Sequence, residues 1–390
     1  MKHQYENGKL TVWLTGRVDT TVAPAIGEEI DKIIEQCGGI SDFILDLCEL
    51  VYISSAGLRV VLRLRQKHDT LRIINASSDI YEIFEMTGFS EMIPIEKAFR
   101  NLSVDGCEII GKGAKGTVYR YDEDIIVKVY NRADSLPDIK NERELARRAF
   151  VLGIPTAISY DIVRVGDKYG SVFELLSASS YSQMIRDDVE NRDRYIDEYA
   201  DLLRRIHSTN VNPNDMPPIK TFIDQWLAAD EPALDDETNK KLRALVDGVS
   251  EPHTMLHCDY HTNNVMRQNG ETLLIDMDTL SYGHPIFELA NVYITYIGFG
   301  EVDKTVVEQF MNMPYDLTKY IWDRFLPRYL GTNDPEKIRT TEEKVRLMSY
   351  VRLLRHTLRR GEDSDTAKAV IALCQKQIPD LLTRVTTLEF

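Results

Sequence analysis

Two short stretches in the second half of the chain decide the fold. Residues 257–264 read HCDYHTNN, and residues 273–278 read LLIDMD. The first has the pattern His-x-Asp-x-x-x-x-Asn, and the second is an apolar run that ends on a carboxylate. Transfer of a phosphoryl group to a hydroxyl needs a carboxylate to accept the proton and oxygen ligands to hold Mg²⁺. The pattern therefore predicts Asp259 as the catalytic base and Asn264 and Asp276 as Mg²⁺ ligands.

A glycine-rich run, GKGAKGTV, occupies residues 111–118. Glycines let a backbone turn tightly and approach phosphate oxygens closely. The same spacing also opens dinucleotide-binding folds, in which a helix follows the glycines directly. Here the β-prone segments 117–121 and 125–130 follow, separated by acidic residues, which predicts a hairpin and disfavours the dinucleotide fold. The glycines expected to face nucleotide phosphates are Gly111, Gly113 and Gly116.

A single lysine stands within the second β-prone segment. Lys128 lies among isoleucines and valines, and a charge in an apolar strand needs an anionic partner or an exposed face. One interpretation is an edge lysine that extends its charge into solvent. The other is a lysine that holds nucleotide phosphates. Glu142, on a predicted helix at 141–152, is the expected partner of Lys128, and Glu144 is the alternative.

The histidines and the cysteine of residues 257–264 also raise the question of zinc. Their spacing matches neither a HExxH nor a CxxC pattern, so the magnesium interpretation explains them better. We expect His257 to be a packed side chain that braces the loop. Asp278 could serve as a further metal contact or as a hydrogen-bonded loop carboxylate, and the sequence leaves both roles open.

Residues 107–390 resemble the aminoglycoside phosphotransferase and choline kinase-like family, which shares the protein-kinase-like fold. The two motifs above carry the resemblance, together with Gly-His-Pro at 283–285 and Glu-Leu-Ala at 288–290. The chain departs from the family pattern at Cys258, where glycine is usual, and at Glu288, where aspartate is usual.

Ser/Thr protein kinases are a weaker match. They usually carry a lysine where this chain has His261, and Asp-Phe-Gly where it has Asp-Met-Asp. A signalling protein kinase therefore remains an alternative, as does a non-catalytic nucleotide-binding module that acts through the N-terminal domain.

The resemblance implies an ATP- and Mg²⁺-dependent transfer of the γ-phosphate to a hydroxyl of a small molecule. Residues 173–176 resemble the hinge that binds adenine, although a plain strand between two lobes would look the same. The cofactor-binding residues that it implies are Gly111, Gly113, Gly116, Val118, Lys128, Glu142, Glu174 and Leu176. The acceptor stays open: aminoglycosides and choline are cations that suit an acidic pocket, and other members phosphorylate sugars or amino-acid alcohols.

The first hundred residues have a different pattern. Leu10, Val12 and Leu14 alternate as in a half-buried strand, and the apolar residues from Ile26 to Ile34 follow a helical period. An apolar strand at 43–47 is interrupted by Asp46, and further helix and strand patterns follow. This order indicates an α/β layer fold.

Residues 1–98 resemble the STAS domain, the fold of anti-sigma factor antagonists. Leu-Asp-Leu at 45–47 and the run VYISSAGL at 51–58 carry the resemblance. It implies a protein partner or ligand and places a phosphorylatable serine at Ser55, where a helix N-terminus favours a dianion. The simpler interpretation is that Ser54 or Ser55 only caps the helix.

The composition sets limits on partners and location. The chain has 390 residues, a formal charge of −15 and five scattered cysteines. An acidic chain disfavours nucleic acid as a partner, and no apolar run is long enough for a membrane span. The absence of an apolar leader and of cysteine pairs predicts a cytoplasmic protein with reduced thiols.

The sequence thus predicts an α/β STAS domain followed by a bilobal α+β protein-kinase-like domain. The expected boundaries are a STAS-like domain at 1–98, a linker at 99–106, a small lobe at 107–177 and a helical lobe at 178–390.

Overall fold

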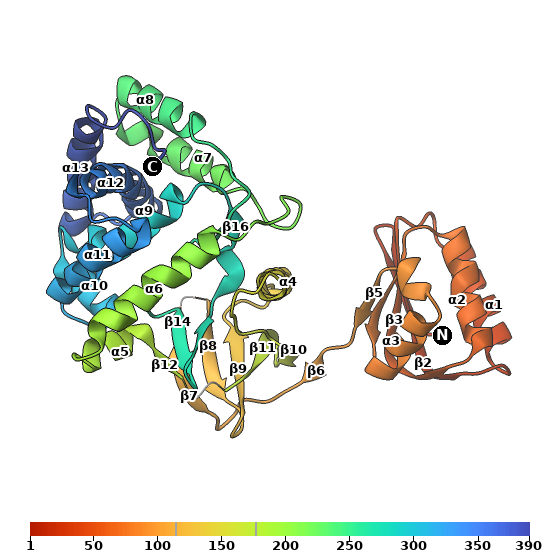
Figure 1. The fold of residues 1–390 in the computed structure, drawn as a ribbon. Helices are drawn as coiled ribbons and strands as arrows, with labels where there is room; N and C mark the ends of the chain where they lie inside the picture. Colours follow the sequence, from red (N-terminus) through yellow and green to blue (C-terminus); the bar gives the residue numbers. More distant parts are fainter. Residues whose placement is uncertain (114, 176–177) are drawn as a thin grey trace. The chain divides into compact units, whose positions relative to one another are not determined.

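A computed structural model describes residues 1–113, 115–175 and 178–390 (Figure 1). The chain divides into two compact units. The first comprises Met1–Ser103 and Ile162–Asp167, and the second comprises Val104–Asp161 and Lys168–Phe390. The sequence boundaries assigned Ile162–Asp167 to the small lobe, whereas its contacts group it with the first unit. The reason is a short parallel pairing of β10 (Asp161–Val165) with β6 (Arg100–Asn101).

The first unit is built on a five-stranded sheet in the order β1-β2-β3-β4-β5. β1 joins β2 antiparallel, and the remaining neighbours are parallel, which confirms the predicted α/β layer fold. The elements are β1 (His3–Glu6), β2 (Lys9–Val18), α1 (Ala23–Glu35), β3 (Asp42–Ile53), α2 (Ser55–Lys67), β4 (Leu71–Ala76), α3 (Ser78–Met86) and β5 (Ile95–Lys97).

Asp46 does not interrupt the third strand as the sequence suggested. β3 continues through it to Ile53, and the Asp46 side chain is buried. Its Oδ1 accepts hydrogen bonds from the Cys48 N–H and from Asn75 Nδ2, each at 3.0 Å. A buried carboxylate with donors of this kind is compatible with a regular strand.

The second unit begins with antiparallel strands and one long helix. Its elements here are β7 (Glu108–Lys112), β8 (Gly116–Arg120), β9 (Ile125–Tyr130), α4 (Leu136–Val151) and β11 (Lys168–Glu174). β8 and β9 form the predicted hairpin, with Gly116 opposite Tyr130. α4 begins earlier than the predicted residue 141, because Pro137 lies in its first turn, where a missing N–H costs nothing.

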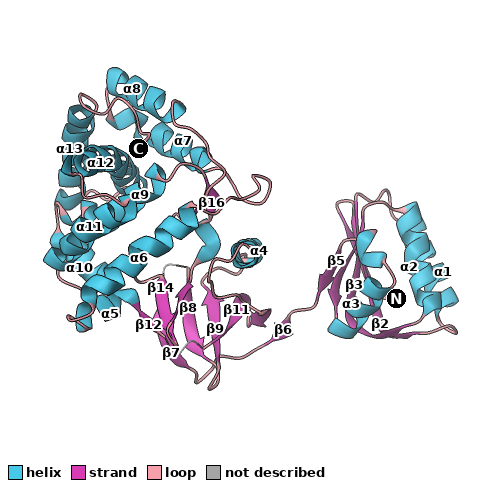
Figure 2. Ribbon diagram, in the orientation of Figure 1, coloured by secondary structure: helices cyan, strands magenta, loops and turns pink. Residues whose placement is uncertain are grey.

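The rest of the second unit is mainly helical, as predicted (Figure 2). Its helices are α5 (Tyr181–Asp187), α6 (Arg192–His207), α7 (Ile219–Asp230), α8 (Asp236–Asp247), α9 (Ile286–Tyr296), α10 (Lys304–Met311), α11 (Tyr315–Leu330), α12 (Pro335–Arg360) and α13 (Asp365–Leu381). Short strands β12 (Ser179–Ser180), β13 (Met255–Leu256), β14 (Val265–Gln268), β15 (Glu271–Leu274) and β16 (Ser281–Tyr282) lie among them.

α5 and α6 are separated by a short break at Asp188–Asn191. Asp188 ends α5, and its carboxylate accepts hydrogen bonds from Asn191 Nδ2 at 2.9 Å and Tyr195 OH at 2.7 Å. Short polar side chains of this kind compete with helical backbone bonds and break the helix. No helix among the described residues is long and apolar enough to span a membrane.

Candidate active site

The two sequence motifs meet at one end of a hairpin. β14 and β15 pair antiparallel with Val265 opposite Leu274, and the N–H of Ile275 donates to the carbonyl of Asn264 at 3.0 Å. Asn264 immediately precedes one strand and Asp276 closely follows the other. The hairpin therefore brings these two side chains to the same edge, although they belong to two separate stretches of the sequence.

Asp259 lies next to this edge. Asn264 Nδ2 donates to the backbone carbonyl of Asp259 at 3.0 Å and to its Oδ2 at 3.3 Å. The Asp259 side chain is 46% exposed, whereas His257 and His261 beside it are buried. Burial lowers the pKa of His261, whose Nε2 lies 3.7 Å from Asp259 Oδ1. A neutral imidazole leaves the Asp259 carboxylate available to accept a proton from a hydroxyl.

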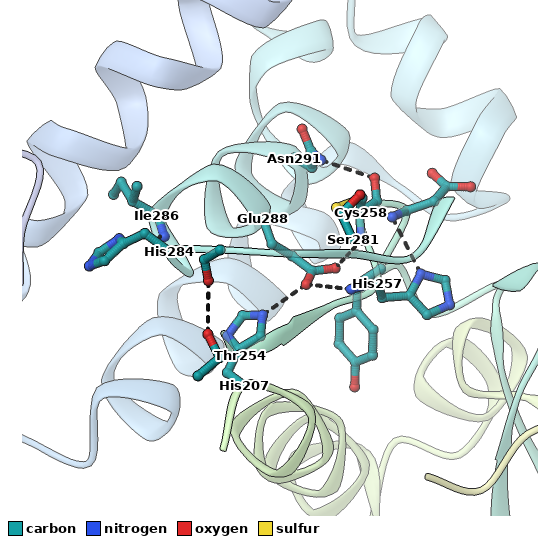
Figure 3. A network of polar contacts seen from close by, with 12 residues as sticks. His207, Thr254, His257, Cys258, Ser281, His284, Ile286, Glu288 and Asn291 are labelled. Atoms are coloured by element: carbon teal, nitrogen blue, oxygen red, sulfur yellow. Dashed lines mark hydrogen bonds and ion pairs between the residues drawn. The ribbon is translucent and has the colours of Figure 1, made fainter. Parts of the chain in front are cut away.

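Glu288 fixes the start of this loop (Figure 3). Its Oε1 accepts the Cys258 N–H at 2.7 Å, and its Oε2 accepts the His257 N–H at 2.8 Å. The same Oε2 lies 2.8 Å from His207 Nε2 of α6. The side chain of Glu288 is fully buried, so these contacts replace its lost hydration. The sequence marked Glu288 only as a departure from the family pattern, and its partners in the loop could not be inferred from it.

Cys258 occupies the position at which the family usually has glycine, and its backbone explains that preference. Its φ is +66°, in the left-handed region, where a side chain costs roughly 1–2 kcal/mol. Its carbonyl accepts a hydrogen bond from Asn291 Nδ2 at 3.0 Å, and its N–H is held by Glu288 (Figure 3). Burial raises the pKa of the Cys258 thiol, which therefore stays protonated.

The far side of the loop is held by tyrosines. Tyr260 OH donates to the carbonyl of Tyr199 at 2.6 Å, and Tyr199 OH donates to the carbonyl of Tyr260 at 3.1 Å. The two rings stack with centroids 4.5 Å apart. The N–H of Thr262 donates to Tyr296 OH at 3.0 Å. The loop is thus fixed on both sides, and Asp259 is its exposed carboxylate.

Lys128 lies between two carboxylates. Its Nζ is 3.0 Å from Glu142 Oε1 and 2.7 Å from Asp276 Oδ1. Burial acts to lower the pKa of Lys128, but these carboxylates outweigh it and raise that pKa, so the ammonium stays charged. Tyr130 OH donates to the other Glu142 oxygen at 2.8 Å and orients it. The alternative partner, Glu144, instead binds two arginines of its own helix.

The glycine-rich run contributes a contact that the sequence did not predict. Lys115 forms an ion pair with Asp278, for which the sequence allowed either a metal contact or a loop carboxylate. Gly116 is required sterically, since a Cβ there would lie 2.6 Å from the carbonyl oxygen of Val129. Added Cβ atoms at Gly111 and Gly113 meet only ordinary contacts.

The predicted hinge is only partly described. Glu174 ends β11 and pairs with Ile125, and the N–H of Leu175 donates to the carbonyl of Asp124 at 2.7 Å. Leu176 lies outside the described residues. Val118 is partly buried in β8, directly opposite Lys128 in β9. These strands therefore place Val118 and Lys128 in neighbouring positions of one sheet.

The side chains present fit Mg²⁺ better than zinc. Asn264 directs its NH₂ group to Asp259, which leaves its amide oxygen as a cation ligand, and Asp276 offers a carboxylate. Mg²⁺ commonly takes one or two protein ligands and completes its shell with phosphates and water. Within residues 1–113, 115–175 and 178–390, no group of three His, Cys, Asp or Glu side chains is arranged to hold a metal.

In the first unit, Ser55 is the exposed first residue of α2, and Ser54 is its buried N-cap. Ser54 Oγ accepts from the Gly57 N–H at 3.4 Å and donates to the carbonyl of Val18 at 3.1 Å. Ser54 therefore serves as the cap, and Ser55 is left accessible at the N-terminus of the helix.

Comparisons with curated proteins match the N-terminal domain. Over 93 residues the chain is 36% identical to BtrV of Bordetella bronchiseptica, described as an anti-sigma factor antagonist. It is 30% identical over 91 residues to an anti-sigma-B factor antagonist of Listeria monocytogenes. Each match covers 78% of the relative, and 23% and 22% of this chain respectively.

Two solved structures illustrate the likeness of the larger part. An ADP-bound aminoglycoside phosphotransferase, APH(2'')-Ib, is 15% identical with a TM-score of 0.48, covering 77% of this chain and 98% of that one. A choline/ethanolamine kinase family protein of Mesorhizobium loti is 14% identical with a TM-score of 0.47, covering 72% and 92%.

Two family profiles cover most of the sequence. The STAS domain profile matches residues 2–102, and the phosphotransferase enzyme family profile matches residues 106–321. The second match includes the glycine-rich run, Lys128, residues 257–264 and Asp276. The chain therefore belongs to the phosphotransferase enzyme family and carries a STAS domain ahead of its phosphotransferase domain.

Proposed function

We propose that the second unit transfers the γ-phosphate of ATP to a hydroxyl group of a small molecule. The observation that carries this proposal is the convergence of Asp259, Asn264, Asp276 and Lys128 at one end of the β14–β15 hairpin. Membership of the phosphotransferase family supports the reaction class. The nucleotide, the metal and the acceptor are our assignments.

In this proposal Asp259 orients the acceptor hydroxyl and takes its proton as the oxygen attacks the phosphorus. Asn264 holds the carboxylate of Asp259 in place. Lys128 moves from its contact with Asp276 onto the nucleotide phosphates, while Glu142 on α4 keeps its ion pair with Lys128. Asn264 and Asp276 would hold Mg²⁺, which when bound neutralises charge on the phosphates.

Replacement of Asp259 by alanine tests this role. We expect Asp259→Ala to lower kcat by about 10²–10⁴-fold, the usual contribution of a general base. The nucleotide Kd should change little, because Lys128 and Asp276 remain. ADP release and nucleotide binding by calorimetry measure the two effects. Asp187→Ala, at an exposed carboxylate outside the site, is the control. Activity of Asp259→Ala equal to that of the control would disprove the role of Asp259.

We also propose that the STAS domain recruits a protein partner or regulates the transferase unit through the α2 N-terminus. Its likeness to anti-sigma factor antagonists and the accessible Ser55 support this. Mass spectrometry after incubation with Mg²⁺-ATP and with cell extract tests for phosphate on Ser55. Unmodified Ser55 in both would remove phosphoregulation and leave partner binding. The five free cysteines support a cytoplasmic location.

A further inference from the structure

Helix α10 lies against the loop of residues 257–264 and carries an exposed aromatic side chain at the contact. Asn263 Nδ2 donates a hydrogen bond to the backbone carbonyl of Phe310 at 3.0 Å. The rings of His261 and Phe310 meet edge to face, with their centroids 5.1 Å apart. The hydrogen bond and the ring contact together fix the end of α10 to the loop that carries Asp259.

One side of α10 is apolar although the core does not bury it. The helix already buries Val307 and Met311, which are four residues apart and share one side. Val306 and Phe310 have the same spacing and form a second apolar side, but they are 42% and 53% exposed. The Phe310 ring therefore contacts His261 with one part of its surface and presents the rest to solvent.

The position of Phe310, and not its exposure, sets it apart from other phenylalanines of this unit. Phe150 and Phe222 are exposed as well, and single apolar side chains on a surface need no explanation. The ring of Phe310, however, contacts the histidine that lies two residues after Asp259. The exposed ring therefore belongs to the surroundings of the candidate active site.

A single side chain, that of His261, links the Phe310 ring to the Asp259 carboxylate. His261 Nε2 lies 3.7 Å from Asp259 Oδ1, and the same imidazole packs on Phe310. His261 is buried, whereas the side chain of Asp259 is 46% exposed. An exposed carboxylate and an exposed ring that both contact one buried imidazole border the same stretch of surface.

The two oxygens of the Asp259 carboxylate face different neighbours. Oδ2 accepts a hydrogen bond from Asn264 Nδ2 at 3.3 Å, whereas Oδ1 faces His261. In the proposed function Asn264 and Asp276 hold Mg²⁺ against the nucleotide phosphates, so the nucleotide occupies the side of Oδ2. The side of Oδ1, which is bordered by His261 and Phe310, is left for the acceptor.

We propose that Phe310 and Val306 form a wall of the acceptor site, and that the acceptor presents a C–H face to them while its hydroxyl faces Asp259. This inference rests on the proposed function. Two kinds of hydroxyl compound have such a face: a sugar in its ring form, and an alcohol that carries a methylated ammonium group. An aromatic ring attracts both, through dispersion and through its negatively polarised face.

The first test compares acceptors in two matched pairs by ADP release from the full chain. Choline is compared with ethanolamine, which keeps the hydroxyl and the charge but lacks the methyl groups. Glucose is compared with sorbitol, which keeps the hydroxyls but lacks the ring. We expect the first member of a pair that is used to have a kcat/KM about 3–10-fold higher. An equal or higher kcat/KM for ethanolamine or sorbitol would overturn the inference while supporting the proposed kinase activity.

The second test removes the Phe310 ring. Phe310→Ala should raise the KM for choline or glucose by about 3–10-fold, with little change in the KM for ATP. Phe310→Tyr, which keeps the ring, should retain the wild-type KM. Phe222→Ala is the matched control, because it removes an exposed ring from α7. If Phe310→Ala lowered kcat equally for both members of a pair and left their ratio unchanged, Phe310 would only support His261 and the inference would be wrong.

A third measurement needs no turnover and follows the Tm with Mg²⁺-ADP saturating, so that the nucleotide site is filled. Choline or glucose should raise the Tm of the wild type and of Phe222→Ala, and should raise that of Phe310→Ala less. Equal protection of the three proteins, or no protection of the wild type by either compound, would overturn the inference. Protection that depends on Phe310, without ADP release from any of the four compounds, would count against the kinase activity alone.

Discussion

Two carboxylates of the second unit are buried to the same extent and surrounded in opposite ways. Glu288 and Asp230 are each 0% exposed. Glu288 faces two backbone N–H groups of the catalytic loop and one histidine nitrogen. For Asp230, neither carboxylate oxygen has a hydrogen-bond partner within the described part of the chain.

The difference teaches that burial alone does not tell what a carboxylate does. Glu288 replaces its lost water with donors from the catalytic loop and α6, so it is a structural anchor. Asp230 has no such replacement, and burial keeps it protonated at neutral pH. The first carboxylate stabilises the loop that holds Asp259, and the second lies in the interior without a hydrogen-bond partner among the described residues.

The largest expected effect is a loss of stability when the Glu288 side chain is removed. Glu288→Ala leaves the N–H groups of His257 and Cys258 and Nε2 of His207 without their partner in the interior. Each unsatisfied buried group costs about 1–3 kcal/mol, so we expect a loss of roughly 3–5 kcal/mol in the free energy of unfolding. Urea denaturation of the variant and the wild type measures this loss in the free energy of unfolding.

Glu362→Ala is the control for this change, since it removes an exposed carboxylate paired with Arg360. Exposed ion pairs contribute about 0–1 kcal/mol, so this variant should remain close to the wild type. If the two variants were equally stable, the anchoring role of Glu288 would be wrong.

The second expected effect is a pH dependence of the free energy of unfolding, and it comes from Asp230. The pKa of Asp230 is raised from 3.8 to about 8 by burial. Between these values the folded state binds more protons than the unfolded state, so the free energy of unfolding falls as pH rises. The slope is at most about 1.4 kcal/mol per pH unit, and it ends once the pH passes the folded pKa.

Asp230→Asn removes this titration while keeping the shape of the side chain. Its Tm should exceed that of the wild type by an amount that grows from pH 5 to pH 8 and then levels off. Thermal unfolding at pH 5, 6, 7, 8 and 9 measures this difference. A difference that stays constant from pH 5 to pH 9 would show that Asp230 is already ionised in the folded protein at pH 5.

The smallest expected effect concerns Asp278, whose partner Lys115 can instead bind nucleotide phosphates. Asp278 is paired with Lys115 of the glycine-rich run, beside Asp276. We expect nucleotide phosphates to take over Lys115, so Lys115→Ala should weaken ATP binding by about 3–10-fold, or about 1 kcal/mol. Lys112→Ala, in the same run and also exposed, should change it less than twofold.

Calorimetric binding of ATP and AMP to both variants provides the measurement. The effect of Lys115→Ala should be larger for ATP than for AMP, because the additional phosphates are the expected partners. Equal weakening of both nucleotides would mean that Lys115 only supports the structure of the run.

The sequence predicted most of the elements because their signals are local. The alternating residues from Leu10 to Leu14 and the glycine run followed by two β-prone segments both form the structures expected of them. The errors have local causes too: Pro137 permits an earlier start of α4, and the hydrogen bonds that Asp46 accepts let β3 continue through it.

The candidate site was predictable only in its motif residues. Asp259, Asn264, Asp276 and Lys128 stand in recognisable patterns, and the fold brings them together. The contacts of Glu288 and Lys115 depend on chain segments far apart in sequence, and no spacing rule encodes them. The contact of Glu288 appears only once α9 packs against residues 257–264, and that of Lys115 only once the glycine-rich run lies beside Asp278.

The burial of the Cys258 thiol offers a way to measure how fast the loop around Asp259 opens. Its thiol is buried and protonated within the loop that carries Asp259, so a thiol reagent can reach it only when the loop opens. The rate at which this sulfur is labelled would therefore time the opening of the catalytic loop. Cys48, which is exposed, would provide the rate of unhindered labelling in the same experiment. Cys258, at a position with positive φ, thus serves as an internal probe of how often the loop around Asp259 opens.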